Sequence, residues 1–189
     1  MDIKIAHKGR ILHADIENMP LTYYVPDYPT AAITAISSAF ADDPSGTLHT
    51  SLLGEVSAIE MLKFFVKRYD EAEVVCFHYG RKHDLPHINA ALVEFGLPPL
   101  GPKLISDTKD DLVKWRGLPK NQEYLGDLFH TDTPKYSMSQ HKWREANRLT
   151  REGINLTRVR VEADVLQNIQ LRAALLEAGL LKTPREWRS

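Results

Sequence analysis

The chain has 189 residues, of which 43% are hydrophobic and 26% are charged, as expected for an ordinary folded protein with a substantial core. With 24 Lys and Arg against 25 Asp and Glu, its formal net charge of -1 excludes a protein that coats nucleic acid through a global basic excess. The single cysteine, Cys76, excludes an internal disulfide and favours a reducing compartment.

Targeting and membrane signals are missing from the sequence as well. No apolar run approaches transmembrane length, and the first ten residues lack a signal-peptide core, so we expect a cytoplasmic protein without a membrane partner. There is no repeat, low-complexity tract or long linker, which predicts a single domain over 1–189 with its core at about 10–180.

The N-terminal part predicts neighbouring antiparallel strands. Residues 10–16 (RILHADI) have the composition of a short strand. The β-prone residues at 21–25 and 31–40 can extend the sheet before the turn-like DDPSG at 42–46. Apolar residues at helical spacing then predict a helix over 56–69.

A crossover follows, because the apolar run at 73–77 predicts a buried strand parallel to the first. We expect a helix from about 85 to 95 with Asp84 as its N-cap, and a short strand around 103–106. Helical pieces precede a long final helix that runs from about Val159 to Gly179. This order predicts an α/β fold with a mixed central sheet flanked by helices.

Four acidic residues, Asp15, Glu17, Asp84 and Asp164, lie where the hydrophobic context predicts packed elements. Asp15 and Glu17 are two apart on a strand, so they share a face with α-carbons roughly 6–7 Å apart. Asp84 follows a buried strand, where open α/β sheets place ligand-binding groups. Asp164 borders the face of the last helix that packs on the sheet.

Buried carboxylates are unfavourable without a partner, and a pair of divalent cations is a common one. Hard oxygen ligands without nearby cysteine favour Mg²⁺ or Mn²⁺ over zinc. Such a site would activate water, orient a phosphodiester and stabilise its leaving oxygen.

The segments around these acids resemble the DEDD superfamily of 3′-5′ exonucleases, which includes polymerase proofreading domains and stand-alone DNA and RNA exonucleases, some of them phage-encoded. The matching segments, in order and spacing, are DIE (15–17), HDLPHINAALVEFGLPPL (83–100), DTKDDL (107–112) and VEADVLQNIQL (161–171). The resemblance covers about Arg10 to Gly179.

The resemblance implies a ribonuclease H-like fold and a two-metal-ion 3′-5′ exonuclease with the four acids as its metal ligands and catalytic residues. Its substrate would be the 3′ end of single-stranded DNA or RNA, its products nucleoside 5′-monophosphates, and a DNA polymerase a partner in replication or repair.

The resemblance also indicates residues that contact the substrate. Asn18 and Met19 follow the first acidic pair, where related exonucleases hold the terminal nucleoside. His78 fits the family's histidine before the second acid, whereas Tyr79 stands in place of an asparagine and His83 in place of an aromatic residue.

The sequence departs from the family at the general base. The family has a histidine five residues before the last acid or a tyrosine four before it, and here Val159 and Arg160 stand there. Arginine cannot deprotonate water near neutral pH, but it can bind the scissile phosphate or offset a carboxylate cluster. Either His141 or Tyr136 supplies the base, or the metal site suffices, or the chain is a catalytically weak or inactive nucleic-acid-binding or polymerase-associated module.

Simpler interpretations stand beside these. Asp15 and Glu17 would also suit an exposed edge strand, Asp84 a helix cap and Asp164 a surface position. A third functional alternative is a zinc-stabilised interaction protein that uses Cys76, His78, His83 and His87, although no second ligand pair closes that site.

Basic and aromatic residues give weaker signals. Between 135 and 160 the basic residues outnumber the acids and predict a phosphate channel, with a solvated helical face as the alternative. These basic residues are Lys135, Lys142, Arg144, Arg148, Arg151, Arg158 and Arg160. Trp115, Trp143 and Trp187 would either stack on bases or pack in the core.

Overall fold

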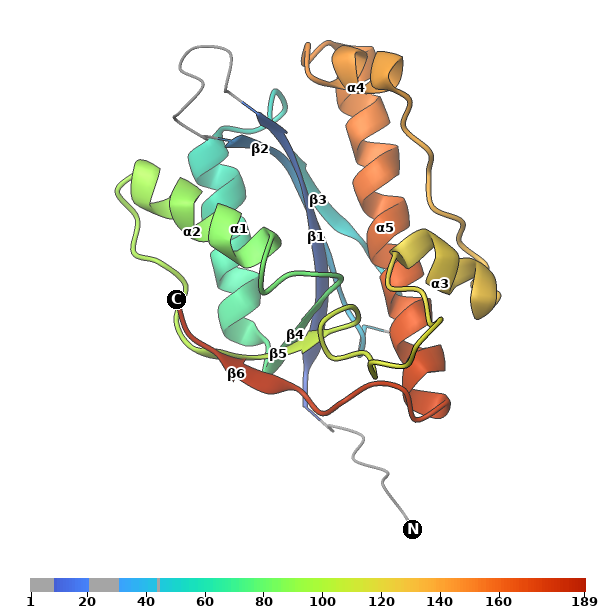
Figure 1. Ribbon diagram of the computed structural model, residues 1–189. Helices are drawn as coiled ribbons and strands as arrows, with labels where there is room; N and C mark the ends of the chain where they lie inside the picture. Colours follow the sequence, from blue (N-terminus) through green and yellow to red (C-terminus); the bar gives the residue numbers. More distant parts are fainter. Residues whose placement is uncertain (1–8, 21–30, 44) are drawn as a thin grey trace.

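A single mixed sheet runs through the computed structural model, which describes residues 9–20, 31–43 and 45–189 (Figure 1). Six strands lie in the order β3-β2-β1-β4-β5-β6. They are β1 (Ile11–Pro20), β2 (Ala31–Phe40), β3 (His49–Leu52), β4 (Val74–Phe77), β5 (Lys103–Asp107) and β6 (Arg185–Trp187). The first three strands are antiparallel, β4 and β5 are parallel to β1, and β6 is antiparallel to β5.

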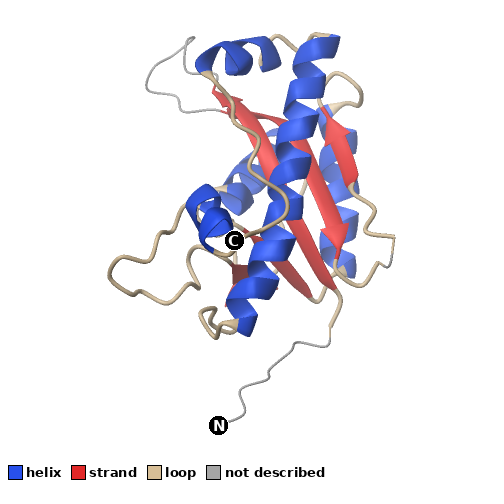
Figure 2. Ribbon diagram, turned by 90° about the vertical axis from the view of Figure 1, so that its right-hand side faces the viewer, coloured by secondary structure: helices blue, strands red, loops and turns tan. Residues whose placement is uncertain are grey.

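Helices cover both faces of this sheet. One face carries α1 (Ala58–Glu71) and α2 (Asp84–Glu94), and the other carries α3 (Gln122–Leu128), α4 (Gln140–Ala146) and α5 (Arg151–Glu177) (Figure 1). Figure 2 shows α5 lying across the sheet. The predicted α/β class with a mixed sheet flanked by helices is therefore confirmed. Within the described ranges, no helix has both the length and the apolar character to span a bilayer.

The alternation of side chains along β1 divides its residues between the two helical layers. Leu12, Ala14 and Ile16 pack in the main core with residues of α1 and α2. Asp15 and Glu17 consequently lie on the opposite face, toward α5. The polar residues of β1 therefore meet the one long helix that covers that side (Figure 1).

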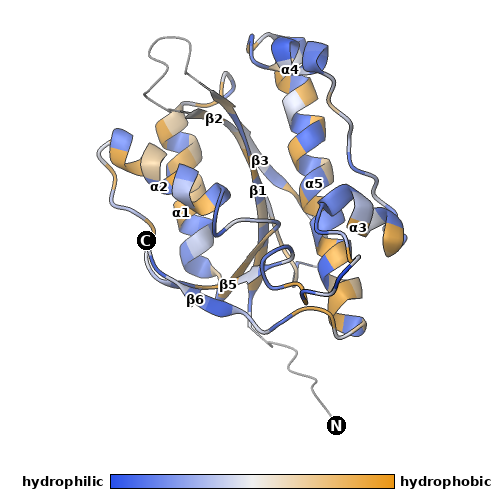
Figure 3. Cartoon of the chain, viewed as in Figure 1, coloured by the Kyte–Doolittle hydropathy of each residue, from blue (hydrophilic) through white to orange (hydrophobic). Residues whose placement is uncertain are grey.

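The final helix begins at Arg151, eight residues before the predicted start. Thr150 caps it, because its hydroxyl accepts a hydrogen bond from the Gly153 N–H. The buried positions of its first turns are Gly153 and Thr157, which give no apolar periodicity. A Cβ at Gly153 would collide with the Glu145 carbonyl at the end of α4, so close helix packing selects a small residue here. Figure 3 shows the more hydrophobic colour concentrated in the C-terminal turns of α5.

One smaller expectation is corrected, two strands were not predicted, and one expected strand is not tested. Asp84 is not the N-cap of α2, because His83 holds that position without a capping side chain and Asp84 is the first helical residue. Strands β3 and β6 were not predicted, since both are short and largely polar or exposed. The strand expected at 21–25 lies outside the described residues.

Candidate functional site

A polar cleft lies beside the carboxyl end of β4 and the middle of its parallel neighbour β1, just beyond the residues that pair the two strands. It has a volume of about 250 Å³, and Asp15, Glu17, Asp84 and Asp164 all line it. We call these residues the four acids. They come from three elements: β1 supplies the first two, the first turn of α2 supplies Asp84, and α5 supplies Asp164. The fold therefore brings together all four acids that the sequence singled out, at the edge where α/β sheets commonly bind ligands.

Three of the four acids are close enough to share one ion. Carboxylate oxygens of Asp15, Glu17 and Asp164 lie within 4.8 Å of one another. Asp84 is outside this trio but is near enough for its charge to raise the pKa of Asp15. The edge-strand, capping and surface interpretations of these acids do not describe this arrangement, because Asp84 and Asp164 are buried.

Burial in the cleft disfavours the charged form of the acids that gather there. Burial, followed by the charges of Asp84, Asp164 and Glu17, raises the pKa of Asp15 well above its ordinary value. Burial raises the pKa of Glu17 to about 7 although Arg160 opposes the shift. Burial also raises the pKa of Asp164. Such mutual repulsion is relieved by a bound cation.

Two basic side chains partly offset this charge. Arg160 donates from Nε to Glu17 Oε1 at 3.2 Å, and its Nη2 lies 2.9 Å from Asp164 Oδ2. Lys135 Nζ lies 3.9 Å from the same Asp164 oxygen. The other oxygen, Asp164 Oδ1, is buried and has no hydrogen-bond partner among the described residues. One ligand atom is therefore left without a protein partner inside the cleft.

Among the residues that the structure describes, the buried acids outside the cleft have hydrogen-bond or ion-pair partners. Asp107 accepts hydrogen bonds from backbone N–H groups in the 79–81 and 109–110 segments. Asp111 pairs with Arg81 and Arg185. Asp164 Oδ1 differs because a buried carboxylate oxygen without a donor is unfavourable unless a ligand completes it. Carboxylate oxygens without a thiolate are also the donor set that Mg²⁺ and Mn²⁺ prefer, so the residues fit these ions.

The turn after β4 shapes one wall of the cleft. Tyr79 has φ of 80°, a left-handed conformation that a bulky side chain rarely adopts. Asp107 Oδ1 accepts the Tyr79 N–H at 2.9 Å, and Lys109 Nζ lies 3.7 Å from the centre of the Tyr79 ring. Asparagine, which the family resemblance would imply at this position, tolerates positive φ far better than tyrosine does.

His78 lies at the start of the same turn. Its Nδ1 is 2.9 Å from Thr108 Oγ1. Burial, assisted by the nearby charges of Lys135 and Lys109, lowers the pKa of His78 to about 3. The imidazole is therefore neutral near physiological pH, and both His78 and Tyr79 line the cleft.

Both residues predicted to replace the general base lie elsewhere. His141 is exposed on α4 and does not line the cleft. Tyr136 is oriented toward Lys142, whose Nζ lies 3.2 Å from the phenolic oxygen, and its backbone carbonyl accepts a hydrogen bond from Arg160. Neither side chain is positioned to take a proton in this cleft.

The predicted nucleoside contacts are also displaced. The register of β1 against β2 shifts between Glu17 and Asn18, and Thr34 is the extra residue on β2. Asn18 and Met19 continue the strand beyond this bulge and are not among the residues that line the cleft.

Several cleft residues had no clear sequence signal. Asn121 and Gln122 begin α3, and Gln122 Nε2 donates to the Asp164 carbonyl at 2.8 Å, which fixes α3 against α5. Lys109 also lines the cleft. His83, which the sequence indicated at the family's aromatic position, also lines the cleft beside Asp84, and a side-chain hydrogen bond with Asp84 raises the pKa of His83.

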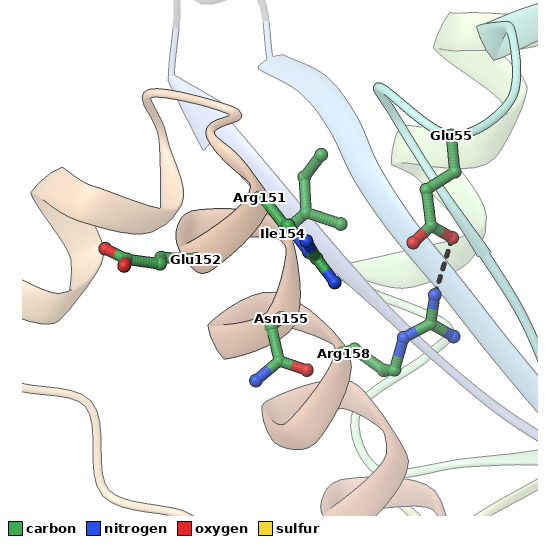
Figure 4. A pocket seen from close by; sticks show the side chains of 6 residues that line it. All are labelled: Glu55, Arg151, Glu152, Ile154, Asn155 and Arg158. Atoms are coloured by element: carbon green, nitrogen blue, oxygen red, sulfur yellow. Dashed lines mark hydrogen bonds and ion pairs between the residues drawn. The ribbon is translucent and has the colours of Figure 1, made fainter.

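The predicted basic channel is split between two places. Lys135 and Arg160 line the acidic cleft, whereas Arg151 and Arg158 line a second cleft of about 720 Å³ (Figure 4). There Arg158 pairs with Glu55 and, at 3.7 Å, with Glu162. The second cleft is therefore nearly charge-balanced.

The zinc alternative finds no support in the described part of the chain. Cys76 is buried in β4 and contacts Asn168, while His83 and His87 stack on each other with ring centres 4.5 Å apart. Among the described residues, the trio of Asp15, Glu17 and Asp164 is the group whose ligand atoms gather as a metal site requires.

Comparison with known proteins supports the fold. No family model matches the chain, and no curated protein matches it. Solved structures do match, and the chain has the ribonuclease H-like α/β fold that the sequence predicted. One of them is a family B DNA polymerase from the hyperthermophilic archaeon Pyrobaculum calidifontis, with a TM-score of 0.66 and 15% sequence identity. The match covers 89% of this chain but 24% of the polymerase, so the chain spans about a quarter of that protein's length.

Proposed function

We propose that this chain is a single-domain, metal-dependent 3′-5′ exonuclease that hydrolyses phosphodiester bonds at DNA or RNA ends. The observation that carries the proposal is the convergence of the four acids in one cleft, where Asp164 Oδ1 is buried and has no hydrogen-bond partner in the described part of the chain. A fold shared with part of a DNA polymerase supports it, because the DEDD pattern in the sequence is that of polymerase proofreading domains.

The proposed roles follow from the placement of the side chains. Asp15, Glu17, Asp84 and Asp164 would hold two divalent cations, Mg²⁺ or Mn²⁺, which when bound polarise a phosphodiester and lower the pKa of water. Lys135 brings positive charge to the same cleft and attracts the phosphate.

Around the acids, neutral polar groups complete the walls of the cleft. His78 and Tyr79 offer ring edges and backbone to a terminal nucleotide, and Gln122 holds Asp164 in place through the helix backbone. The products are nucleoside 5′-monophosphates, and a DNA polymerase is the macromolecular partner that the fold favours.

Arg160 favours a second candidate function. Its guanidinium contacts both Glu17 and Asp164, so it occupies two proposed ligands and cannot itself act as a base. A chain in which Arg160 keeps these contacts would bind nucleic acid with little or no cleavage. The second candidate is therefore a weakly active or inactive binding module of the same fold.

One assay separates the two candidates. End-labelled single-stranded DNA and RNA are incubated with the protein and Mn²⁺ or Mg²⁺, beside an Asp164→Asn variant. Stepwise shortening from the 3′ end by the unmutated protein alone supports the exonuclease, and the variant should be slower by more than about 100-fold. Binding of either strand without shortening under both metals would support the binding module instead.

A further inference from the structure

A groove with exposed aromatic side chains lies next to the acidic cleft. Trp115 is 64% exposed and Tyr124 is 62% exposed, and both line one hollow of about 650 Å³ with Pro119, Leu128 and His130. Aromatic rings of this size are normally buried, and an open pair in one hollow indicates a binding surface. We call this hollow the aromatic groove.

The segment that forms one wall of the aromatic groove is basic, while α3 adds a single acid, Asp127, to the lining. The segment 114–120 reads KWRGLPK, with three basic residues and no acid. Arg116 lines the groove, and within the described chain Lys114, Arg116 and Lys120 take part in no ion pair. Basic residues interleaved with exposed aromatic rings are typical of surfaces that bind single-stranded nucleic acid, because every base can stack and every phosphate is anionic.

Helix α3 borders both the aromatic groove and the acidic cleft. Asn121 and Gln122 line the cleft, whereas Tyr124 and Leu128 on the same helix line the groove. The helical rise places the far end of α3 roughly 10 Å from Gln122. A strand whose 3′ end enters the cleft therefore meets the groove within its next few nucleotides.

We propose that the aromatic groove is an accessory binding site for the single-stranded part of the nucleic acid, upstream of its 3′ end. Two or more bases stack on Trp115 and Tyr124 while Arg116 contacts a phosphate. This inference rests on the proposed function, since it assumes that the strand reaches the cleft. The second cleft of Figure 4 lacks aromatic residues and pairs Arg158 with acids, so it does not compete for this role.

The test measures binding without cleavage. Oligothymidylates of 3, 6 and 12 nucleotides with a 5′ fluorescein are titrated with the full chain in EDTA, and affinity is read from fluorescence anisotropy. Trp115→Ala and Tyr124→Ala each remove one of the two rings on which a base would stack. Each change should weaken binding of the 12-mer at least about fivefold but leave the 3-mer unchanged. Trp115→Phe should retain most of the affinity, because it keeps a ring.

Two matched controls address charge and surface aromatics in general. Arg116→Gln should reduce the salt dependence of 12-mer binding by about one phosphate contact, whereas Arg151→Gln in the second cleft should not. Phe95→Ala removes an aromatic ring that is 41% exposed at the end of α2 and should not alter binding. Thermal unfolding of each variant confirms that it is folded.

The outcomes distinguish this proposal from the proposed function. Length-dependent loss of affinity in the Trp115 and Tyr124 variants supports the groove even if no end-labelled strand is shortened. Unchanged 12-mer affinity in folded variants overturns the groove, whether or not the exonuclease assay succeeds. A groove that serves a protein partner instead would give this second result.

Discussion

Arg160 lies one helical turn before Asp164 on α5, and its Nη2 is 2.9 Å from Asp164 Oδ2. The resemblance to DEDD exonucleases implies a tyrosine base at this position, and here a cation partly neutralises Asp164 instead. If the cleft binds a divalent ion as proposed, Arg160 would compete with that ion for the same carboxylates and weaken its binding.

Removing this cation should destabilise the metal-free protein, and bound metal should offset most of the loss. Arg160→Gln loses two charge-assisted hydrogen bonds, so in EDTA it should cost about 1.5–3 kcal/mol of the free energy of unfolding. In saturating Mn²⁺ most of this loss should be recovered, and the variant should bind Mn²⁺ more tightly than the unmutated chain. Thermal unfolding with and without Mn²⁺ measures both effects.

Arg158→Gln is the matched control for Arg160→Gln, because Arg158 lies on the same helix and pairs with acids, Glu55 and Glu162, away from the acidic cleft. An equal Mn²⁺ response in the two variants would contradict the role given to Arg160.

Asp15→Asn should stabilise the metal-free protein. Its carboxylate is disfavoured by burial and by three neighbouring acids, so a neutral amide removes repulsion at pH 8. The same change should abolish stabilisation by Mn²⁺. Asp107→Asn serves as the control: that buried acid accepts several backbone N–H groups, and its loss should cost about 1–3 kcal/mol. Differential scanning fluorimetry compares the two, and a destabilised Asp15→Asn in EDTA would disprove the expectation.

Glu17 should make the metal-free protein less stable as pH rises. Its pKa of about 7 in the folded protein exceeds the ordinary 4.5, so the folded state keeps a proton that the unfolded chain releases. The stability that this proton supports is complete below about pH 4.5 and is lost as pH rises through 7. Glu17→Gln stays neutral, so its advantage over the unmutated chain in EDTA should grow between pH 5 and 8. Urea unfolding across this range measures the difference, and a pH-independent difference would refute it.

His13 should act in the opposite direction in acid. Burial, followed by the charge of Arg172, lowers the pKa of His13 from 6.5 to about 3. Its contribution to stability is complete above pH 6.5 and declines as pH falls toward 3, because only the unfolded chain takes up the proton readily. In His13→Leu the free energy of unfolding should therefore fall less steeply with decreasing pH, by about 1.4 kcal/mol per pH unit. Urea unfolding of both proteins between pH 4 and 7 measures this difference. Above pH 7 the difference between the two proteins should not change with pH.

Much of the fold was accessible from periodicity in the sequence. The helix predicted at 56–69 is α1, and the apolar run at 73–77 is β4 with its predicted parallel pairing to β1. These elements bury apolar side chains at regular spacing, which is the signal that sequence patterns carry. The first turns of α5 lack that signal, because Gly153 and Thr157 pack by being small.

The candidate site was accessible only in part. The four acids follow from a motif, but their partners come from tertiary structure. Asp111 is as acidic in sequence as Asp164 and is fully buried, yet two arginines satisfy it. No local pattern distinguishes a carboxylate that meets arginine from one that is left open, since the arginines lie 30 and 74 residues away. The positions of His141 and Tyr136 were likewise beyond sequence, because the path of the 129–139 segment determines them.

The length of α5 has a mechanical consequence. Arg158 borders the second cleft and Asp164 the acidic cleft, six residues or roughly 9 Å apart along one continuous helix. An α-helix does not compress over so short a distance, so the two openings share a rigid wall. A partner that displaced α5 where Arg158 pairs with Glu55 would therefore also displace Asp164, a proposed metal ligand. The walls of the two clefts would move together.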